Sequence, residues 1–149
     1  MNILIALIAG LTGYLVGSLS FSRIVINVRA PGEDVSAPIK HTISTSGTVF
    51  ESSSTGATAA RFKLGTKYGC FVTILDILKA VIPSLIFKLW KPDMPFYLVA
   101  ASLAIVGHNY PIYYKFKGGR GLSTILGGFL VLDWVGVIVT NTVGFLLGG

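Results

Sequence analysis

The stretch that decides the fold is "YGCFVTILDILKAVIPSLIF", residues 68–87, an almost uninterrupted apolar run. As a helix, about 20 residues cross roughly 30 Å, the thickness of the hydrocarbon core of a membrane. Three other windows, residues 2–20, 95–114 and 122–147, have a similar length and character. Of the 149 residues, 52% are hydrophobic and 12% are charged, which is membrane composition. We therefore predict an all-α, polytopic integral membrane helix bundle of about four spans, with residues 1–149 forming one membrane domain.

The first window is interpreted as a membrane span, because no Lys or Arg precedes its apolar run as in a signal peptide. Small residues lie inside the windows, at Gly13, Gly17, Gly107 and Gly127. They would weaken an isolated helix, but in lipid they let two backbones approach closely. Their presence favours helices that pack on one another.

Positive charges divide unevenly among the connections between the windows. The first connection carries six Lys and Arg, the second two, and the third three, at Lys115, Lys117 and Arg120. Because cytoplasmic loops are rich in Lys and Arg, nine cations against two place the first and third connections in the cytoplasm and the N-terminus outside. The simplest role for most of them is to anchor this topology and contact anionic lipid head groups.

Most of the first connection, residues 26–67 and here called the polar loop, differs in composition from the rest. Its second half, "STSGTVFESSSTGATAARFKLG", is rich in Ser, Thr and Gly. Such a composition is typical of a flexible linker. A connection of this length is, however, either disordered or functional as a rule, and its small residues suit backbone amides that wrap an anion.

Two opposite charges lie within the window 68–87. Asp76 and Lys79 are spaced i, i+3 and so share one face of a helix, where they can meet. Charges in a membrane span are costly, and by default they mark a functional site or neutralise each other. Asp76 lies eight residues, about 12 Å of helix, inside the window, which favours function over a structural pair.

His108 lies in the last third of the window 95–114 and is followed by Pro111. The proline is expected to kink or end the helix and to free backbone groups there. A single histidine is more often a structural group than a catalyst. A titratable side chain inside a membrane segment is nevertheless a candidate for function.

"KFKGGRG", residues 115–121 and here called the glycine loop, follows this histidine and precedes "LSTILGG". Glycines let the backbone approach an anion and adopt positive φ, so that successive amides converge on phosphate oxygens. A helix beginning at Leu122 would add the partial positive charge of its N-terminus. Together with Lys79 and the polar loop, this predicts a phosphate site at the cytoplasmic membrane surface, beside an apolar bundle able to hold an acyl chain.

Two other kinds of site find no support in the sequence. The two histidines and six carboxylates do not fall at metal-ligand spacing, and we predict no metal. "GGRGLS" lacks the spacing and the Gly-Lys-Ser/Thr ending of a P-loop.

Three stretches resemble the bacterial membrane acyl-phosphate:glycerol-3-phosphate acyltransferases: "GYLVGSLSF", "STGATAARFKLGTKYG" followed by "LDILKAVIP", and "GHNYPIYYKFKGGRGLSTILGG". The resemblance covers residues 13–128 and implies a multi-pass protein of the bacterial inner membrane whose active face is cytoplasmic. It further implies transfer of a fatty acyl group from acyl phosphate to glycerol 3-phosphate, which gives lysophosphatidic acid for phospholipid synthesis. The implied partners are these two substrates and membrane lipid, with no cofactor, metal or nucleic acid.

Site residues carry over at the matching positions. The resemblance implies a catalytic set of Lys79, His108, Ser52 and Arg61, and supporting roles for Ser18 and Asp76. It implies a substrate-phosphate site formed by Lys115, Lys117, Gly118, Gly119, Arg120, Gly121, Gly56, Ala57 and Thr58. The attacking hydroxyl would lose its proton either to His108 or to a substrate phosphate.

The chain departs from the family pattern in the second motif, usually Gly-Ser-Gly-Asn, one variable residue, and Gly-Ala-Thr-Asn. Here Glu51 and Ser53 replace the first and second glycines, and Ser54 and Ala59 replace both asparagines. The downstream arginine, Arg61, comes one residue early. An acidic Glu51 beside a phosphate site would repel its ligand unless paired. The residues between Pro31 and Thr48 form a longer, more polar segment than in the family. Family members also continue through further spans to a segment with His and Asn, so this chain is expected to be a fragment or a reduced relative.

Two other functions compete with the enzyme. A non-catalytic membrane protein could keep the phosphate-binding or lipid-binding shell and act as a regulatory partner. A channel or transporter subunit could line a polar path with Asp76, Lys79 and His108, although the polar and glycine loops favour a site at the cytoplasmic side.

Overall fold

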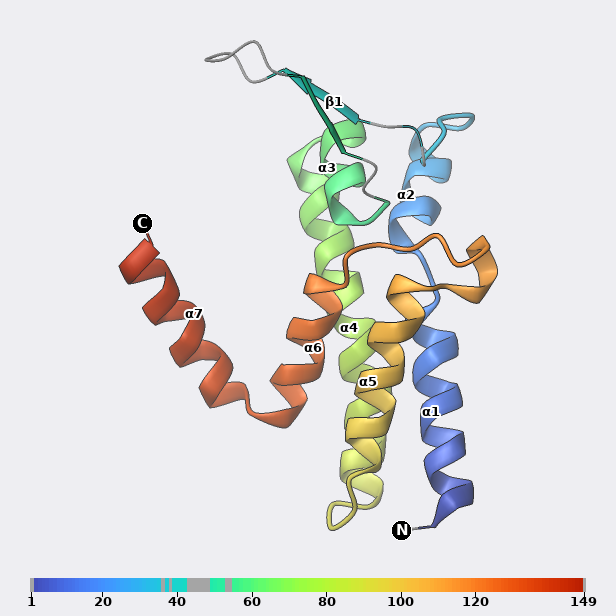
Figure 1. The fold of residues 1–149 in the computed structure, drawn as a ribbon, viewed down its shortest axis with the longest axis vertical. Coiled ribbons are helices and arrows are strands. Elements are labelled where there is room, and N and C mark those ends of the chain that lie inside the picture. Colours follow the sequence, from blue (N-terminus) through green and yellow to red (C-terminus); the bar gives the residue numbers. More distant parts are fainter. Residues whose placement is uncertain (1, 36, 38, 43–48, 53–54, 149) are drawn as a thin grey trace.

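The computed structural model describes residues 2–35, 37, 39–42, 49–52 and 55–148. Figure 1 shows the order of the elements along the chain. They are α1 (Ile3–Gly17), α2 (Phe21–Arg29), β1 (Ile39–Thr42), β2 (Val49–Ser52), α3 (Ala57–Leu64), α4 (Thr66–Trp90), α5 (Phe96–Asn109), the 3-10 turn η1 (Ile112–Tyr114), α6 (Leu122–Leu132) and α7 (Trp134–Gly148).

The core of the fold is a bundle in which α5 contacts α1, α4 and α6, and α4 also packs against α1 and α6. Figure 1 shows these helices running side by side, with the glycine loop, α2 and α3 near one end. The N-terminus and the turn between α4 and α5 lie at the other end. The predicted helix bundle is therefore confirmed.

Glycines bring α1 and α5 into backbone contact, as the sequence predicts. A Cβ atom added at Gly13 or Gly17 would lie 2.2 Å from the carbonyl oxygen of Ala100 or Ala104, respectively. On the other helix, a Cβ atom at Gly107 would lie 2.3 Å from the carbonyl oxygen of Tyr14. Gly127 plays the same part in α6, where its Cβ would lie 2.4 Å from the Ile77 carbonyl oxygen. Small residues thus set the distance between the helices that carry the site.

The helices differ from the predicted windows in two places. Helix α5 ends at Asn109, two residues before Pro111, as expected from the proline. The single span predicted over residues 122–147 is wrong, because the chain breaks at Asp133, which has an extended backbone between α6 and α7. The carboxylate of Asp133 accepts a hydrogen bond of 2.9 Å from the amide of Gly136 and so begins a new helix.

Two helical segments of the described chain are long and apolar enough to cross a membrane, Ile3–Arg29 and Thr66–Trp90. Helices α6 and α7 are apolar but shorter. None of the described residues of α7 is buried, and Figure 1 shows this helix leaning away from the bundle. The count of about four spans and the outside N-terminus stay predictions.

The polar loop contains more structure than its composition indicates. It includes the end of α2, an antiparallel hairpin in which Ile39 pairs with Ser52 and Thr42 with Val49, and α3. The hairpin is a local addition to the all-α fold and lies above α3 in Figure 1. Buried apolar residues join α2 and α3 to α4, among them Ile26, Ala60 and Val72. This packing holds the second motif against the bundle.

Candidate active site

A buried ion pair lies at the centre of the site. Asp76 and Lys79 face the same way from α4, and their side chains are 3% and 1% exposed. The Lys79 Nζ atom is 3.0 Å from Asp76 Oδ1, and it donates a 2.8 Å hydrogen bond to the carbonyl oxygen of Leu19. Leu19 follows the end of α1, where carbonyl groups have no partner inside the helix. Lys79 therefore links α4 to the first motif, and the pairing predicted from the spacing is confirmed.

His108 projects from α5 toward the same carboxylate. Its Nδ1 atom is 3.7 Å from Asp76 Oδ1, which is too long for a hydrogen bond. The side chain is only 9% exposed, and within the described chain Nδ1 is buried with no hydrogen-bond partner. Burial of an unpaired polar atom is unfavourable, so this nitrogen is available to a ligand or a water molecule.

The glycine loop folds directly over His108. The amide of Gly119 donates a 3.2 Å hydrogen bond to the carbonyl oxygen of His108. A Cβ atom at Gly118 would lie 2.1 Å from that carbonyl oxygen, and one at Gly119 would lie 2.4 Å from His108 Nε2. Both glycines are thus required by close approach. Positive φ, which was expected of the glycines, occurs at Gly121 but also at Lys115 (52°) and Phe116 (60°).

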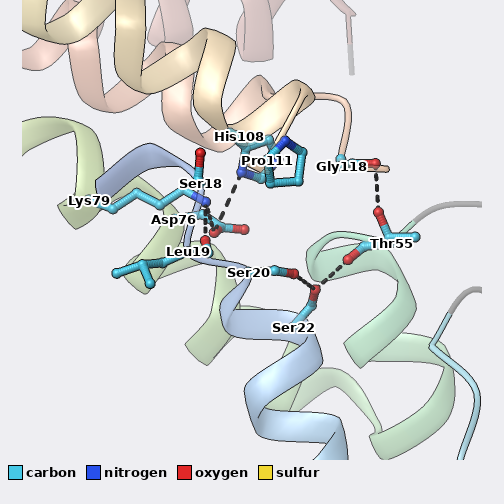
Figure 2. Close-up of a pocket in the computed structure, with 11 residues that line it drawn as sticks. Ser18, Leu19, Ser20, Ser22, Thr55, Asp76, Lys79, His108, Pro111 and Gly118 are labelled. Carbon is cyan, nitrogen blue, oxygen red and sulfur yellow. Dashed lines mark hydrogen bonds and ion pairs between the residues drawn. The ribbon is translucent and has the colours of Figure 1, made fainter. Parts of the chain in front are cut away.

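A chain of hydroxyl groups joins the three sequence motifs, as Figure 2 shows. Ser20 Oγ is 3.1 Å from Ser22 Oγ, which donates a hydrogen bond to the carbonyl oxygen of Thr55. Thr55 Oγ1 in turn donates a 2.6 Å hydrogen bond to the carbonyl oxygen of Gly118. The sequence prediction missed Ser20, Ser22 and Thr55. Their only signal was their position within the motifs, for Ser20 and Thr55, or next to one, for Ser22, because their partners include backbone carbonyls that the fold brings near.

Ser18 connects α1 to the turn that follows α5. Its hydroxyl donates a 2.8 Å hydrogen bond to the carbonyl oxygen of Tyr14 and accepts a 3.4 Å hydrogen bond from the amide of Ile112. The Tyr14 hydroxyl group donates to the carbonyl oxygen of Tyr110, 3.0 Å away, in the same connection. Ser18 thus ties the end of α1 to this connection, and its supporting role at the site stays a prediction.

These residues enclose a small cavity. Its lining consists of Ser18, Leu19, Ser20, Ser22, Thr55, Asp76, Lys79, His108, Pro111, Gly118 and Gly119. The free space measures about 10 Å³, which holds about one water molecule and is smaller than a glycerol phosphate.

Other residues expected at the site lie outside the cavity. Gly56 faces the glycine loop, because a Cβ atom there would be 4.0 Å from the Cα atom of Gly119, and Ala57 begins α3. The side chains of Glu51 and Ser52 lie outside the described part of the chain. Five of the expected residues are exposed and do not line the cavity: Thr58, Arg61, Lys115, Lys117 and Arg120. Gly121, which precedes α6, does not line the cavity either, but it is buried and lies beside the Asn109 side chain.

Arg61 is exposed because its helix, α3, turns its other face to the bundle. Ala59 and Ala60 are buried there, whereas Arg61 packs its first side-chain carbons over Gly69, at 2.6 Å from a Cβ atom added at that glycine. Within the described residues, no three His, Cys, Asp or Glu side chains gather in a way that could hold a metal ion.

Taken together, the fold and the site define an integral membrane helix bundle with a buried lysine under a glycine-rich loop. The model of the family described as glycerol-3-phosphate acyltransferase matches residues 7–148. The chain belongs to this glycerol-3-phosphate acyltransferase family, as the three motifs predicted.

Named relatives and solved structures agree with this assignment. The glycerol-3-phosphate acyltransferase of Mycoplasma capricolum subsp. capricolum is 34% identical over 146 residues, which cover 94% of this chain and 51% of that protein. The enzyme of the same name from Legionella pneumophila strain Corby is 32% identical over 136 residues, covering 89% and 43%.

Crystal structures of PlsY (YgiH), an integral membrane glycerol 3-phosphate acyltransferase, share the fold. The glycerol 3-phosphate form has a TM-score of 0.77 at 29% identity and covers 95% of this chain and 64% of that one. The lysophosphatidic acid form has a TM-score of 0.71, also at 29% identity, with coverage of 92% and 61%. The chain spans about half the length of the curated relatives that it matches.

Proposed function

We propose that this chain carries the glycerol-phosphate site of an acyltransferase that moves a fatty acyl group from acyl phosphate to glycerol 3-phosphate. The observation that carries the proposal is Lys79, a buried cation held under the glycine loop at the end of a membrane bundle. The crystal forms of PlsY with glycerol 3-phosphate and with lysophosphatidic acid support glycerol 3-phosphate as the acceptor. Acyl phosphate as the donor rests on the sequence resemblance.

In the proposed reaction the main task of the protein is to position the two substrates. A hydroxyl oxygen of glycerol 3-phosphate attacks the carbonyl carbon of the acyl phosphate, the new ester bond forms, and the bond to the phosphate oxygen breaks. Inorganic phosphate leaves with its electron pair. Because both substrates are anions, the site must offset their repulsion and hold them close. Lys79, the amides of the glycine loop and the nearby exposed cations are proposed to supply this positive charge.

The hydroxyl proton has two acceptors within this proposal, His108 and a substrate phosphate. His108 touches the glycine loop and has a buried nitrogen without a partner in the described chain, which supports its contact with substrate. Asp76 faces both Lys79 and His108 and is proposed to fix their positions.

The active face is proposed to be cytoplasmic in a multi-pass protein of the bacterial inner membrane. One end of the bundle carries the glycine loop, α2 with Arg23 and Arg29, and α3 with Lys63. The other end carries Lys88, in the last turn of α4, and Lys91, which follows this helix. This excess of cations at the end that carries the site supports the orientation. Labelling of single cysteines placed at residues 92 and 117 from either side of the membrane tests it, and labelling of residue 117 from outside would contradict it.

A second candidate function is phosphate or lipid binding without turnover. The small volume of the cavity, the exposed Arg61 and the altered second motif favour it. Acyl transfer by the purified chain, with radiolabelled glycerol 3-phosphate and palmitoyl phosphate, separates the two. Lysophosphatidic acid formed above the level of a Lys79→Met variant supports the enzyme, whereas saturable glycerol 3-phosphate binding without product supports the binding protein.

A further inference from the structure

We propose that Thr55 and Arg23 are positioning residues that hold two backbone carbonyls of the glycine loop and thereby turn its amide groups toward the site. The inference rests on the proposed function, because the direction of these amides matters when the loop binds a phosphate. Thr55 stands at the variable position of the second motif, and Arg23 follows the first motif.

The contacts fall on two successive carbonyls. Thr55 Oγ1 donates a 2.6 Å hydrogen bond to the carbonyl oxygen of Gly118. Arg23 donates through Nη2 to the carbonyl oxygen of Lys117 at 3.1 Å, and its guanidinium carbon lies 5.0 Å from the centre of the Tyr114 ring. Both donors come from outside the glycine loop, one preceding α3 and one from α2.

The planar peptide bond converts these contacts into an orientation. In a trans peptide the carbonyl and the following N–H point in opposite directions. A hydrogen bond that draws the Gly118 carbonyl toward Thr55 therefore turns the Gly119 N–H to the other side of the loop. There it donates to the carbonyl oxygen of His108 at 3.2 Å, beside the cavity. By the same geometry, Arg23 on the Lys117 carbonyl directs the N–H of Gly118.

The loop needs such tethers because of its own sequence. Gly118 and Gly119 have no Cβ atom, so rotation of the peptide planes around them meets little steric resistance. Close packing on His108 requires these glycines, since side chains there would clash with it. The His108 carbonyl holds the amide of Gly119, and the side chains of Thr55 and Arg23 hold the carbonyls of Gly118 and Lys117 on the other side of the same peptide planes.

Thr55 is well placed for this role, since it is only 7% exposed and is itself held in place. Ser22 Oγ donates to its carbonyl oxygen, and Ser20 contacts Ser22. Figure 2 shows the resulting line from α2 through Thr55 to Gly118. The direction of the loop amides is thus tied to the position of α2 relative to the bundle.

Thr55→Val tests the inference, because valine keeps the shape of threonine and removes the donor. Thr55→Ser keeps the donor, and Thr73→Val is the matched control, since Thr73 Oγ1 donates to the Gly69 carbonyl oxygen at 2.9 Å inside α4. We expect Thr55→Val to raise KM for glycerol 3-phosphate about two- to tenfold, the loss of one hydrogen bond, with kcat little changed. Thr55→Ser and Thr73→Val should match the parent.

Hydrogen exchange of residues 115–121, followed by mass spectrometry in detergent, gives a reading that does not depend on turnover. In Thr55→Val the amides of these residues should exchange about two- to tenfold faster than in the parent, the same factor as expected for KM. In Thr55→Ser their exchange rate should match the parent. Arg23→Met should likewise raise the exchange rate of these amides and KM for glycerol 3-phosphate. Arg23→Lys keeps a donor, so both increases should be smaller in this variant.

An unchanged KM in Thr55→Val, or a failure of Thr55→Ser to restore it, overturns the inference while the proposed function stands. If the parent itself transfers no acyl group, the proposed function fails instead. The exchange comparison, repeated with inorganic phosphate, then decides: equal exchange in the parent and Thr55→Val overturns the inference, and faster exchange with weaker protection by phosphate supports it.

Discussion

Removal of the charge on Lys79 is expected to affect stability and activity through different partners, and these effects can be separated. In Lys79→Met, the Asp76 side chain stays buried at 3% exposure and loses the cation 3.0 Å away. Breaking a buried ion pair by removing one partner costs about 3–5 kcal/mol, because an uncompensated charge is left behind. The Leu19 carbonyl also loses the 2.8 Å hydrogen bond that joins α1 to α4.

The double variant Asp76→Asn/Lys79→Met removes both charges and keeps similar side-chain volumes. Replacing a buried pair by neutral groups is often close to neutral for stability, so we expect the double variant to recover at least half of the loss. Acyl transfer should stay reduced by about 100-fold or more in both variants, because neither has the cation of the proposed phosphate site. Lys91→Met, an exposed lysine beyond the end of α4, is the control and should change stability by less than about 0.5 kcal/mol.

Equilibrium unfolding in mixed micelles measures the stabilities, and the radiolabel assay measures transfer. A Lys79→Met variant as stable as the parent would show that the buried pair contributes nothing to the fold. Recovery of activity together with stability in the double variant would refute the role of Lys79 in turnover, and leave it as a structural residue only.

Other expectations follow from the close contacts of the glycines and from His108. Gly17→Ala should destabilise the bundle by at least about 2 kcal/mol, because its Cβ would lie 2.2 Å from the Ala104 carbonyl oxygen. Gly144→Ala is the control and should not destabilise it, because a Cβ atom there would have nothing within 4 Å. Equilibrium unfolding in micelles compares the two variants. Gly119→Leu should abolish acyl transfer without preventing membrane insertion, since the leucine side chain would enter the space of His108. Protease protection checks the insertion. A fully active variant would contradict the placement of the glycine loop. His108→Gln should lower kcat about 100-fold or more if His108 takes the hydroxyl proton; a loss below about tenfold assigns that proton to a substrate phosphate.

Much of the bundle was predictable because lipid restricts the possible structures. Long apolar windows predict helices, and the glycines at positions 13, 17 and 107 mark the contact between α1 and α5. The spacing of Asp76 and Lys79 predicts their pairing without knowledge of the rest of the chain. Each of these features depends on one helix or on one pair of helices.

The features that escaped prediction depend on where distant backbone groups lie. Composition gave no sign of the break at Asp133, because a single carboxylate in an apolar window does not reveal whether it caps a helix. Ser22 and Thr55 bond to carbonyl oxygens 33 and 63 residues away, and every residue has a carbonyl, so spacing cannot identify such partners. The hairpin of the polar loop escaped for a related reason, since Ser, Thr and Gly are typical of linkers as well.

The same distinction explains why the expected cations and the observed cavity do not coincide. A sequence shows that charged residues lie near a glycine loop, but it does not show which way their side chains point. In this loop Gly118 and Gly119 line the cavity, and the long charged side chains are exposed. Lys115, Lys117 and Arg120 are all exposed, whereas Lys79, which reaches the site from α4, is buried. The strongest charge on a bound phosphate would therefore come from the residue with the most restricted position. Because Lys79 also holds Leu19 and Asp76, a ligand that draws its ammonium group away weakens contacts between α1 and α4. Binding at this site is thus coupled to the packing of the bundle, so glycerol 3-phosphate should change the unfolding free energy of the parent more than that of Lys79→Met.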